Sequence, residues 1–334
     1  MPNLGRPTMH DVARAAGVSH QTVSNVLHGR GRVGAATRER VAAAIEELGY
    51  RPHAGAASLR TRRTNRLAHP LAIGELGPMN ANTIMLEFIQ SLTTAAGRRG
   101  QHLVLSGAPD HKLDDVVELF RSGAVDAVVL ANVLPRDERV DTLARLNLPF
   151  ACFGRTDKAY PQTWVDVDSR VGVAELTKHL IRSGHTRISF IGYASFGQWD
   201  LDREQGYADA MSDAGLPQHV SIVEQTTVAA AQALDHLLDG PDAPTAIVTG
   251  SDVLAGNVYT AAAQRGLRIG SDLAVTGFDA SLVGRLLTPS LTTAAIPTDY
   301  ITDRLIARVL AELDGPTDAP GELVRPDLVF GESA

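Results

Sequence analysis

Short polar side chains cluster between residues 19 and 25 of the 334-residue sequence. Gln21 and Asn25 each carry an amide, which offers a donor beside an acceptor and can pair with the edge of an adenine base. Nearby hydroxyl groups are suited to phosphate oxygens. These hydroxyls belong to Thr8, Ser19, Thr22 and Thr37. Such residues fit a nucleic-acid contact, but they also serve as helix caps and as solvated surface, so the elements that carry them decide their role.

Three short helices are predicted around these residues. Thr8 begins a capping box, which predicts a helix over residues 9–16. Ser19 is suited to cap a second helix over residues 20–27, and an apolar pattern of helical period predicts a third over residues 35–48. Two short helices across a Gly-centred turn form a helix-turn-helix, whose second helix enters the major groove. The side chains that would face the bases are His20, Gln21, Ser24 and Asn25.

Charge is divided unevenly along the chain. The net charge is −7, yet residues 1–66 hold eleven Arg, no Lys and four acidic residues, so this part carries +7 and the remainder −14. A basic head on an acidic body keeps the attraction to phosphate local. Cys152 is the only cysteine, which excludes a disulfide framework and a Cys-based zinc site. We expect a soluble cytoplasmic protein, because residues 1–17 lack a signal-peptide core and no run is long enough to span a membrane.

The body is predicted to be α/β. From residue 67 onward, apolar β-type runs alternate with helical patterns, which predicts parallel strands covered by helices on both faces. The predicted strands span residues 102–106, 125–130, 150–153, 188–192, 222–224, 246–249 and 273–276. The series is too long for one small sheet, so we expect two doubly wound lobes. A ligand would bind in the crevice outside the carboxyl ends of the strands.

Several motifs resemble the lactose-repressor (LacI/GalR) family of transcriptional regulators. They are DVARAAGVS at residues 11–19, ELGYRP at 47–52, GFD at 277–279 and LTPSLTT at 287–293. The resemblance implies a helix-turn-helix DNA-binding domain at 1–49, a hinge helix and linker at 50–66, and an effector-binding and dimerisation domain at 67–334 of the type I periplasmic-binding-protein kind. It implies an N-lobe of about 67–165 and 297–322, and a C-lobe of about 166–296 and 323–334.

Further DNA contacts are implied by the resemblance. In that family the segment after the Tyr-x-Pro becomes a hinge helix in the minor groove, and residues 53–61 match it. Leu59 matches a leucine that wedges between base steps, and Ala56 the small residue beside it. Asn25 stands where Arg is usual, which leaves the base preference at that position open. The resemblance adds Tyr50, His53, Ala56 and Leu59 to the predicted DNA contacts.

An effector site in the crevice is implied as well. Arg203 matches an arginine that hydrogen bonds effector hydroxyls or carboxylates, and Asp279 matches an acid that accepts from sugar hydroxyls. Ser251 stands where many relatives have Asn. The remaining candidates are Ile84 and Met85, an apolar floor in place of an aromatic pair, and Trp199, which could stack on a sugar from a strand-to-helix loop.

The residues by themselves leave other roles open. Arg203 could form a structural salt bridge, Asp279 could cap a helix, and Trp199 could be a core aromatic. Asp166 and Asp168 are expected to cap a helix that begins at Ser169.

The function that we expect is that of a dimeric regulator, most simply a repressor that a sugar or oligosaccharide releases from a palindromic operator. One alternative is a co-repressor-dependent regulator with a non-sugar effector. Another is a plain sugar-binding protein, in which residues 1–66 would have no role. The sequence contains no nucleophile elbow, phosphate loop or zinc-protease motif, so we expect no enzymatic activity, no metal and no cofactor.

Overall fold

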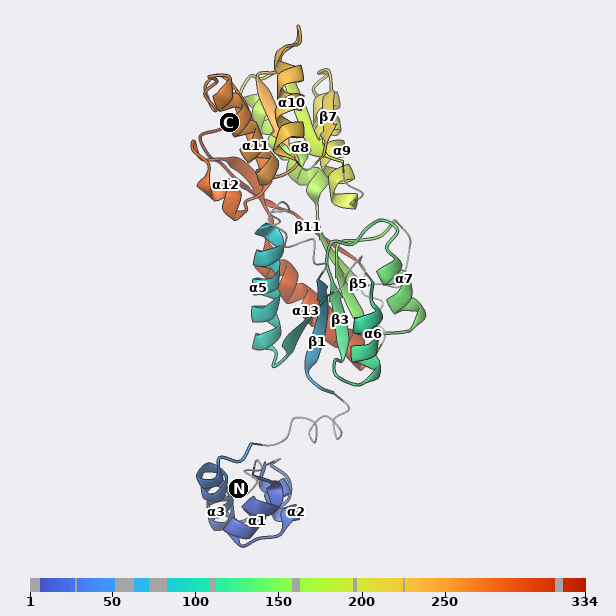
Figure 1. Cartoon of the computed structure of the whole chain (residues 1–334), viewed down its shortest axis with the longest axis vertical. Coiled ribbons are helices and arrows are strands. Elements are labelled where there is room, and N and C mark those ends of the chain that lie inside the picture. Colours follow the sequence, from blue (N-terminus) through green and yellow to red (C-terminus); the bar gives the residue numbers. More distant parts are fainter. Residues whose placement is uncertain are drawn as a thin grey trace. The chain divides into compact units, whose positions relative to one another are not determined.

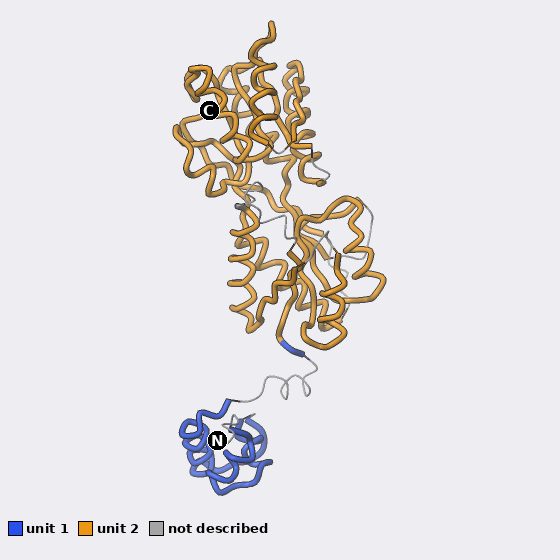
Figure 2. Tube along the Cα trace, viewed as in Figure 1, with its two compact units in different colours: residues 1–64 blue, residues 65–334 orange. Residues whose placement is uncertain are grey.

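Two compact units, residues 1–64 and 65–334, make up the computed structural model of the chain (Figure 2). It describes residues 7–27, 29–51, 63–71, 83–107, 112–157, 163–194, 197–224, 226–315 and 321–334. Across these ranges, no helix is both long and apolar enough to cross a membrane.

The first unit is a three-helix head. Its helices are α1 (Met9–Ala16), α2 (His20–Leu27) and α3 (Ala35–Leu48), with the bounds that the caps and the apolar period predict. Thr8 and Asp11 form the predicted capping box, and Gly17 ends α1 in the left-handed conformation. The three helices share one small core, centred on Val12, Val23 and Val41.

The first lobe of the second unit is built on a parallel sheet (Figure 1). Its strands follow the order β11-β5-β4-β3-β1-β2. Their bounds are β1 Arg66–Leu71, β2 His102–Gly107, β3 Ala127–Leu130, β4 Phe150–Phe153, β5 Thr163–Val167 and β11 Glu322–Val324. Helices α5 (Thr83–Arg98) and α13 (Thr298–Asp314) pack on one face, and α6 (Asp114–Arg121) and α7 (Glu138–Arg145) on the other.

The second lobe repeats this architecture with the strand order β12-β10-β9-β8-β6-β7. Its strands are β6 Ile188–Tyr193, β7 His219–Val223, β8 Ala246–Thr249, β9 Ala274–Asp279, β10 Thr292–Ala295 and β12 Asp327–Val329, and only β12 is antiparallel to its neighbour. Helices α8 (Ser169–Arg182) and α9 (Gln198–Asp213) cover one face. Helices α10 (Thr227–Leu238) and α11 (Asp252–Gln264) cover the other, and α12 (Leu282–Leu286) follows β9.

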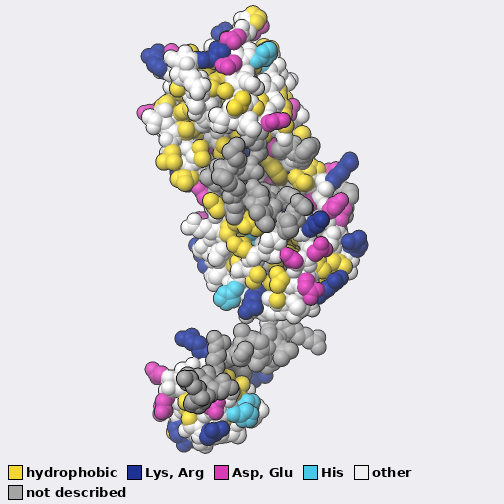
Figure 3. Space-filling view, in the orientation of Figure 1, with side chains coloured by type: hydrophobic (Ala, Val, Ile, Leu, Met, Phe, Trp, Pro, Cys, Tyr) yellow, Lys and Arg dark blue, Asp and Glu magenta, His cyan; other side chains and the backbone are white. Residues whose placement is uncertain are grey.

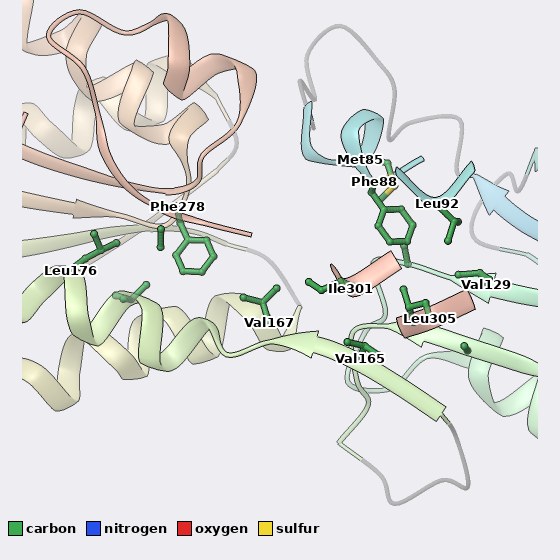
Figure 4. Packing of buried hydrophobic residues seen from close by; sticks show 14 of the residues in the cluster. Met85, Phe88, Leu92, Val129, Val165, Val167, Leu176, Phe278, Ile301 and Leu305 are labelled. Carbon is green, nitrogen blue, oxygen red and sulfur yellow. The ribbon is translucent and has the colours of Figure 1, made fainter. Parts of the chain in front are cut away.

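The chain passes between the lobes three times, each time after the carboxyl end of a strand. The passages follow β5, β10 and β11, so the first sheet holds the chain through Val167 and again through Val324. Both points lie two residues beyond the predicted lobe boundaries. The difference arises because β11 pairs with β5 as far as the last residue of each strand. One apolar cluster continues through the passage, where Val167 and Ile301 lie between Phe278 and Phe88 (Figure 4).

The predicted α/β class is confirmed, and each of the seven predicted strands overlaps an observed one. The largest shifts are of three residues: β7 begins at His219 and not at 222, and β9 ends at Asp279 and not at 276. Strands β1, β5, β10, β11 and β12 were not among the predicted strands. The last two are three residues long, and their pairing depends on distant segments.

Candidate DNA-binding and effector sites

In the head, hydroxyl groups hold the helix ends. Thr8 Oγ1 donates to Asp11 Oδ2 at 2.7 Å and accepts from the backbone N–H of Asp11. Asp11 Oδ2 accepts from both the hydroxyl and the backbone N–H of Thr8, and these two hydrogen bonds lower the pKa of the Asp11 carboxyl. Ser19 Oγ accepts from the backbone N–H of Thr22 at 3.1 Å, and the two hydroxyls are 2.9 Å apart. Capping is therefore the role observed for Thr8 and Ser19, and any phosphate contact by them remains a prediction.

Helix α2 presents the predicted base-facing residues on its accessible side. His20 and Gln21 are exposed, and Ser24 and Asn25 are half-buried. Gln21 Nε2 donates to Asn25 Oδ1 at 3.2 Å, so the two amides orient each other one turn apart. The ring of His20 lies 4.7 Å from that of His10 on α1. His10 was not among the predicted contacts, and the ring pair depends on how α1 packs on α2.

Tyr50 does not fit the predicted role. Its side chain is 7% exposed and packs in the core of the head, which indicates a structural residue. Thr37 lies on α3 and is half-buried. The hinge residues His53, Ala56 and Leu59 lie outside the described residues.

In the second lobe, Arg203 on α9 reaches the carboxyl ends of two strands. Its Nη1 donates to the carbonyl of Gly250 at 2.5 Å, and its Nη2 contacts Asp279 Oδ1 at 3.2 Å. The guanidinium lies over the ring of Phe278, 4.0 Å from the centroid. Although the side chain is buried, Arg203 Nε has no acceptor among the described residues. A buried donor without a partner is costly, which marks the place where a ligand could bind.

Asp279 stands at the end of β9 in an unusual environment. Burial raises its pKa to about 7, against the lowering effect of Arg203, and the carboxylates of Asp252 and Asp200 raise it further. Both Asp279 and Ala280 have positive φ angles, 111° and 51°. Such backbone conformations persist only where the surrounding structure holds them, and they concentrate at functional sites. A structural salt bridge was one of the alternative roles for Arg203. That salt bridge exists, and its partner is Asp279, the second effector candidate.

Two further residues line the same strand ends. Ser251 Oγ caps α11 by accepting from the backbone N–H of Leu254 at 3.2 Å, and it also bonds the hydroxyl of Tyr193. Burial raises the pKa of Tyr193. Tyr193 was not predicted as a site residue, although its position at the end of β6 was a signal for one. The cluster thus joins groups from β6, β9, α9 and α11.

Two of the three predictions for the apolar part of the site change with the structure. Met85 is 2% exposed and belongs to the core of the first lobe, so it cannot be a solvent-accessible floor in this arrangement. Ile84 is half-buried. Trp199 lies in the first turn of α9 and not in a loop, with its half-buried indole folded back over Gly197. Phe153, the last residue of β4, was not predicted as a site residue; it is half-buried and stacks on Phe88, with the ring centroids 5.1 Å apart.

One buried carboxylate organises the second lobe. Asp252 is fully buried and accepts from the backbone N–H of Ser281 and from Thr293 Oγ1, both at 2.6 Å. Burial raises its pKa to about 6. Gly277 and Gly284 lie so close to this carboxylate that a Cβ on either would approach it within 3 Å. Asp252 therefore has a structural role: its hydrogen bonds link α11 to the segments after β9.

An arginine of the first lobe forms an ion pair with a residue of the second lobe. Arg155, which follows β4, contacts Asp166 on β5 at 2.5 Å and also Asp202 on α9. Asp166 therefore pairs with Arg155, and its predicted capping role is wrong. Asp168 does cap α8, because its Oδ1 accepts from the backbone N–H of Val171 at 3.1 Å. Neither Arg155 nor Asp202 was predicted as a site residue.

Comparison with known proteins gives two family matches. Residues 8–53 match the family described as bacterial regulatory proteins, lacI family, and residues 177–334 match the periplasmic binding protein-like domain. The HTH-type transcriptional regulator DegA of Bacillus subtilis is 32% identical over 87% of each chain. A solved complex of the transcriptional regulator CelR with cellobiose is 28% identical, covers 98% of this chain and all of that one, and has a TM-score of 0.70. The Lac repressor dimer bound to operator and an anti-inducer, at 22% identity, has the same fold, with a TM-score of 0.83 and 98% of each chain covered.

Proposed function

Because the chain belongs to the lacI family of bacterial regulatory proteins, we propose that it is a dimeric repressor that a sugar or oligosaccharide releases from a palindromic operator. The family's members are DNA-binding transcriptional regulators and not enzymes, and this chain is one of them. Three features are proposed: the protein represses transcription, its effector is a sugar, and its operator is palindromic. A regulator of this kind works beside its DNA, so we place it in the cytoplasm.

The observation that carries the sugar proposal is the unpartnered Nε–H of Arg203 beside Asp279. A vicinal diol can accept from the guanidinium and donate to the carboxylate, so a neutral polyol satisfies both groups. An anionic effector would instead meet Asp279, with Asp252 and Asp200 close enough to perturb its titration. This charge balance favours a sugar over an organic acid. The cellobiose complex of the related regulator supports a disaccharide as the first probe.

Thermal-shift titration tests the ligand. The purified protein is titrated with cellobiose and a panel of other disaccharides, because a ligand that binds only the folded state raises the melting temperature by mass action. Arg203→Lys is the key variant, since lysine keeps the charge and loses the planar fork of donors. We expect the shift caused by the active sugar to disappear in this variant. A full shift in Arg203→Lys would contradict the assigned site.

Gel-shift titration on the DNA upstream of the protein's own gene tests whether the sugar weakens or strengthens operator binding. We expect operator affinity to fall when the active sugar is added, because a ligand changes an equilibrium only through unequal affinity for the two states. An increase would identify a co-repressor, which is the alternative function. No change with any sugar that gives a thermal shift would remove the proposed coupling.

Exposed apolar residues of the second lobe support a homodimer. They include Val220 and Ile222 on the edge strand β7, Val228 on α10, and Leu286 on α12, which is 74% exposed. Exposed apolar side chains on these separate elements are available for association with a second copy. We expect light scattering to give twice the monomer mass, and Leu286→Glu to lower the mass or weaken dimerisation. A monomeric wild-type protein would contradict the proposal.

The proposed DNA contacts combine base reading with phosphate contacts. Base reading is assigned to His20, Gln21, Ser24 and Asn25, which the exposed side of α2 supports. Thr8, Ser19, Thr22 and Thr37 are assigned to phosphates. The hinge contacts of His53, Ala56 and Leu59 are proposed from the resemblance alone.

A further inference from the structure

The end of the first lobe at which β1 begins carries a group of exposed arginines. Arg66 is the first residue of β1, and Arg98, Arg121 and Arg145 lie in the last turns of α5, α6 and α7. Since the helices run opposite to the parallel strands, all four lie at the amino-terminal end of the sheet. Figure 3 shows basic side chains and a histidine on this part of the lobe. We refer to the four arginines as the basic end.

The basic end differs from most of the body in its ion pairing. Within the described residues, none of its four arginines forms an ion pair. Elsewhere in the body most arginines pair with a carboxylate, as Arg99 does with Asp303 at 2.6 Å and Arg170 with Asp209 at 2.5 Å. Acidic residues near the basic end have other roles. They include Asp126, which accepts from the backbone N–H of Asn65, and Asp303, which pairs with Arg99 and whose pKa the charge of Arg98 also lowers.

Helix dipoles offer a simpler explanation for the arginines of the basic end, because a cation stabilises the carboxyl end of a helix. The second lobe provides the comparison, since its helices end at the corresponding end of its sheet. There α9 ends on Asp213, and Arg265 after α11 is paired with Asp235 at 2.6 Å and Asp239 at 3.0 Å. Of the helix-end arginines in that lobe, only Arg182, in the last turn of α8, lacks an ion pair among the described residues. Helix ends in this protein therefore do not require free arginines, and the first lobe has more of them than its dipoles explain.

Chain connectivity places the basic end next to the linker. Arg66 follows directly on the segment that leads from the head, and the fifteen residues from Arg51 to Arg66 span at most about 50 Å when fully extended. A duplex held by the head is thereby kept at high effective concentration near this end of the lobe. The rest of the body is acidic and repels DNA, so a favourable contact requires a local excess of positive charge.

We propose that the basic end is a second DNA-contacting surface, which binds phosphates without reading bases. Arginine is suited to this contact because its donors match phosphate oxygens and its charge persists at any cellular pH. The surface adds affinity and salt dependence but no sequence preference. Arg98, Arg121 and Arg145 lie outside the helix-turn-helix and the predicted hinge and linker, and Arg66 is the last residue of that linker.

The test is the salt dependence of DNA binding by the full chain. Wild type and the triple variant Arg98→Gln, Arg121→Gln, Arg145→Gln are titrated against a labelled 40-bp duplex of mixed sequence, from about 50 to 200 mM NaCl. Removing one arginine that neutralises a phosphate makes the slope of log affinity against log salt shallower by about 0.9. Over this fourfold range of salt, each such removal reduces the change in affinity about threefold. We expect the triple variant to show at least this reduction.

Two controls separate a contact from a general effect of charge. Arg182→Gln removes an unpaired, helix-end arginine from the second lobe, and its slope should equal that of wild type. Replacing the same three first-lobe arginines by lysine should keep the wild-type slope, because the charge remains. Melting curves establish that each variant is folded, and if the triple variant is not, the three single variants are measured instead.

The outcomes are distinct. The proposal is supported if the slope is shallower when the first-lobe arginines are replaced by glutamine, and unchanged both in the lysine variant and in Arg182→Gln. An unchanged slope overturns it and indicates helix capping or an acidic protein partner for these arginines. An equal change in Arg182→Gln also overturns it, since the effect would then follow net charge. Failure of the basic end leaves DNA binding by the wild-type head intact, so it is distinguishable from failure of the regulatory function.

Discussion

At the scale of single residues, the head combines structural and recognition roles in neighbouring side chains. Thr8 and Ser19 use their hydroxyls to cap helices, which leaves the amides of Gln21 and Asn25 as the groups best placed to read bases. Their mutual hydrogen bond of 3.2 Å orients both amides before any base arrives. Pre-organised side chains lose less conformational entropy on binding.

Gln21→Ala should therefore weaken operator binding by about 1–3 kcal/mol and relax the preference at one base pair. The slope of affinity against salt should stay the same, because no phosphate contact is removed. Binding to a library of operator variants at two salt concentrations measures both effects. A uniform loss over all sequences would show that Gln21 contacts the backbone and not a base.

The proposed role of Asp279 predicts that effector binding depends on pH. Burial raises its pKa to about 7, so in the free protein it takes up a proton as the pH falls below that value. A sugar hydroxyl donates best to the ionised carboxylate, so affinity should increase as pH rises from about 6 to 8 and then level off. Asp279→Asn should bind more weakly at pH 8 and lose this dependence. Calorimetric titration with the active sugar at several pH values is the measurement, and a flat wild-type profile would exclude Asp279 as the acceptor.

In the free protein, the contribution of Asp279 to folding stability should fall as pH rises, whereas the affinity for the effector should rise. In the unfolded chain the carboxyl group has a pKa near 3.8, whereas in the fold its pKa is about 7. Between these values the folded state holds a proton that the unfolded state has lost, so the contribution of Asp279 to stability decreases as pH rises. A binding site that costs stability in this way fits a group kept for its ligand.

At the scale of elements, the contact between α8 and α9 positions Arg203. The two helices approach so closely at Gly206 that a Cβ there would lie 2.2 Å from the backbone carbonyl of Arg170. Only glycine permits this approach, which sets the distance from α9 to the strand ends. The position of Arg203, one turn earlier on α9, thus depends on a residue that touches no ligand.

Gly206→Ala should destabilise the protein by about 1–3 kcal/mol, because the helices must separate to admit the methyl group. The matched control is Gly97→Ala on α5, where a Cβ would have no atom within 4 Å. That change should be neutral or stabilising by up to about 1 kcal/mol, owing to the higher helix propensity of alanine. Urea denaturation measures both. Equal stabilities for the two variants would contradict the tight packing of α8 on α9.

At the scale of the whole molecule, two ion pairs among the described residues join the lobes of the body in addition to the three chain passages. Arg155 of the first lobe contacts Asp202 of the second, and Glu87 on α5 contacts Arg285 beyond β9 at 2.6 Å. Asp202 adjoins Arg203, while Arg285 also donates to the carbonyl of Ala280, next to Asp279. Each pair therefore connects the first lobe to a segment of the proposed effector site.

Asp202→Asn should loosen the connection between the lobes without unfolding either. Hydrogen exchange near residues 167–169 and 295–298 should accelerate, and the ratio of operator affinities with and without the active sugar should change. Asp166→Asn is the matched control, because it removes the partner of Arg155 that lies in the same lobe. It should lower stability by about 1–3 kcal/mol and leave the ratio unchanged. The same ratio change in both variants would show that the crossing contact has no special role.

Those parts of the molecule that depend on local interactions could be predicted from the residues alone. Helix caps, turns and apolar periods act over a few residues, which is why the bounds of α1, α2 and α3 and the alternation of strands and helices follow from the sequence. Motif spacing also sufficed to indicate the family and to select Arg203 and Asp279.

Which side chains meet depends on the tertiary fold. Arg203 and Asp279 are 76 residues apart, and Arg155 and Asp202 are 47 apart, so no local pattern records either contact. The burial of Met85 and Tyr50 likewise follows from the packing of distant helices and strands. Long-range pairing and burial depend on how whole elements pack, because the free energy that favours them arises only when the segments are brought together.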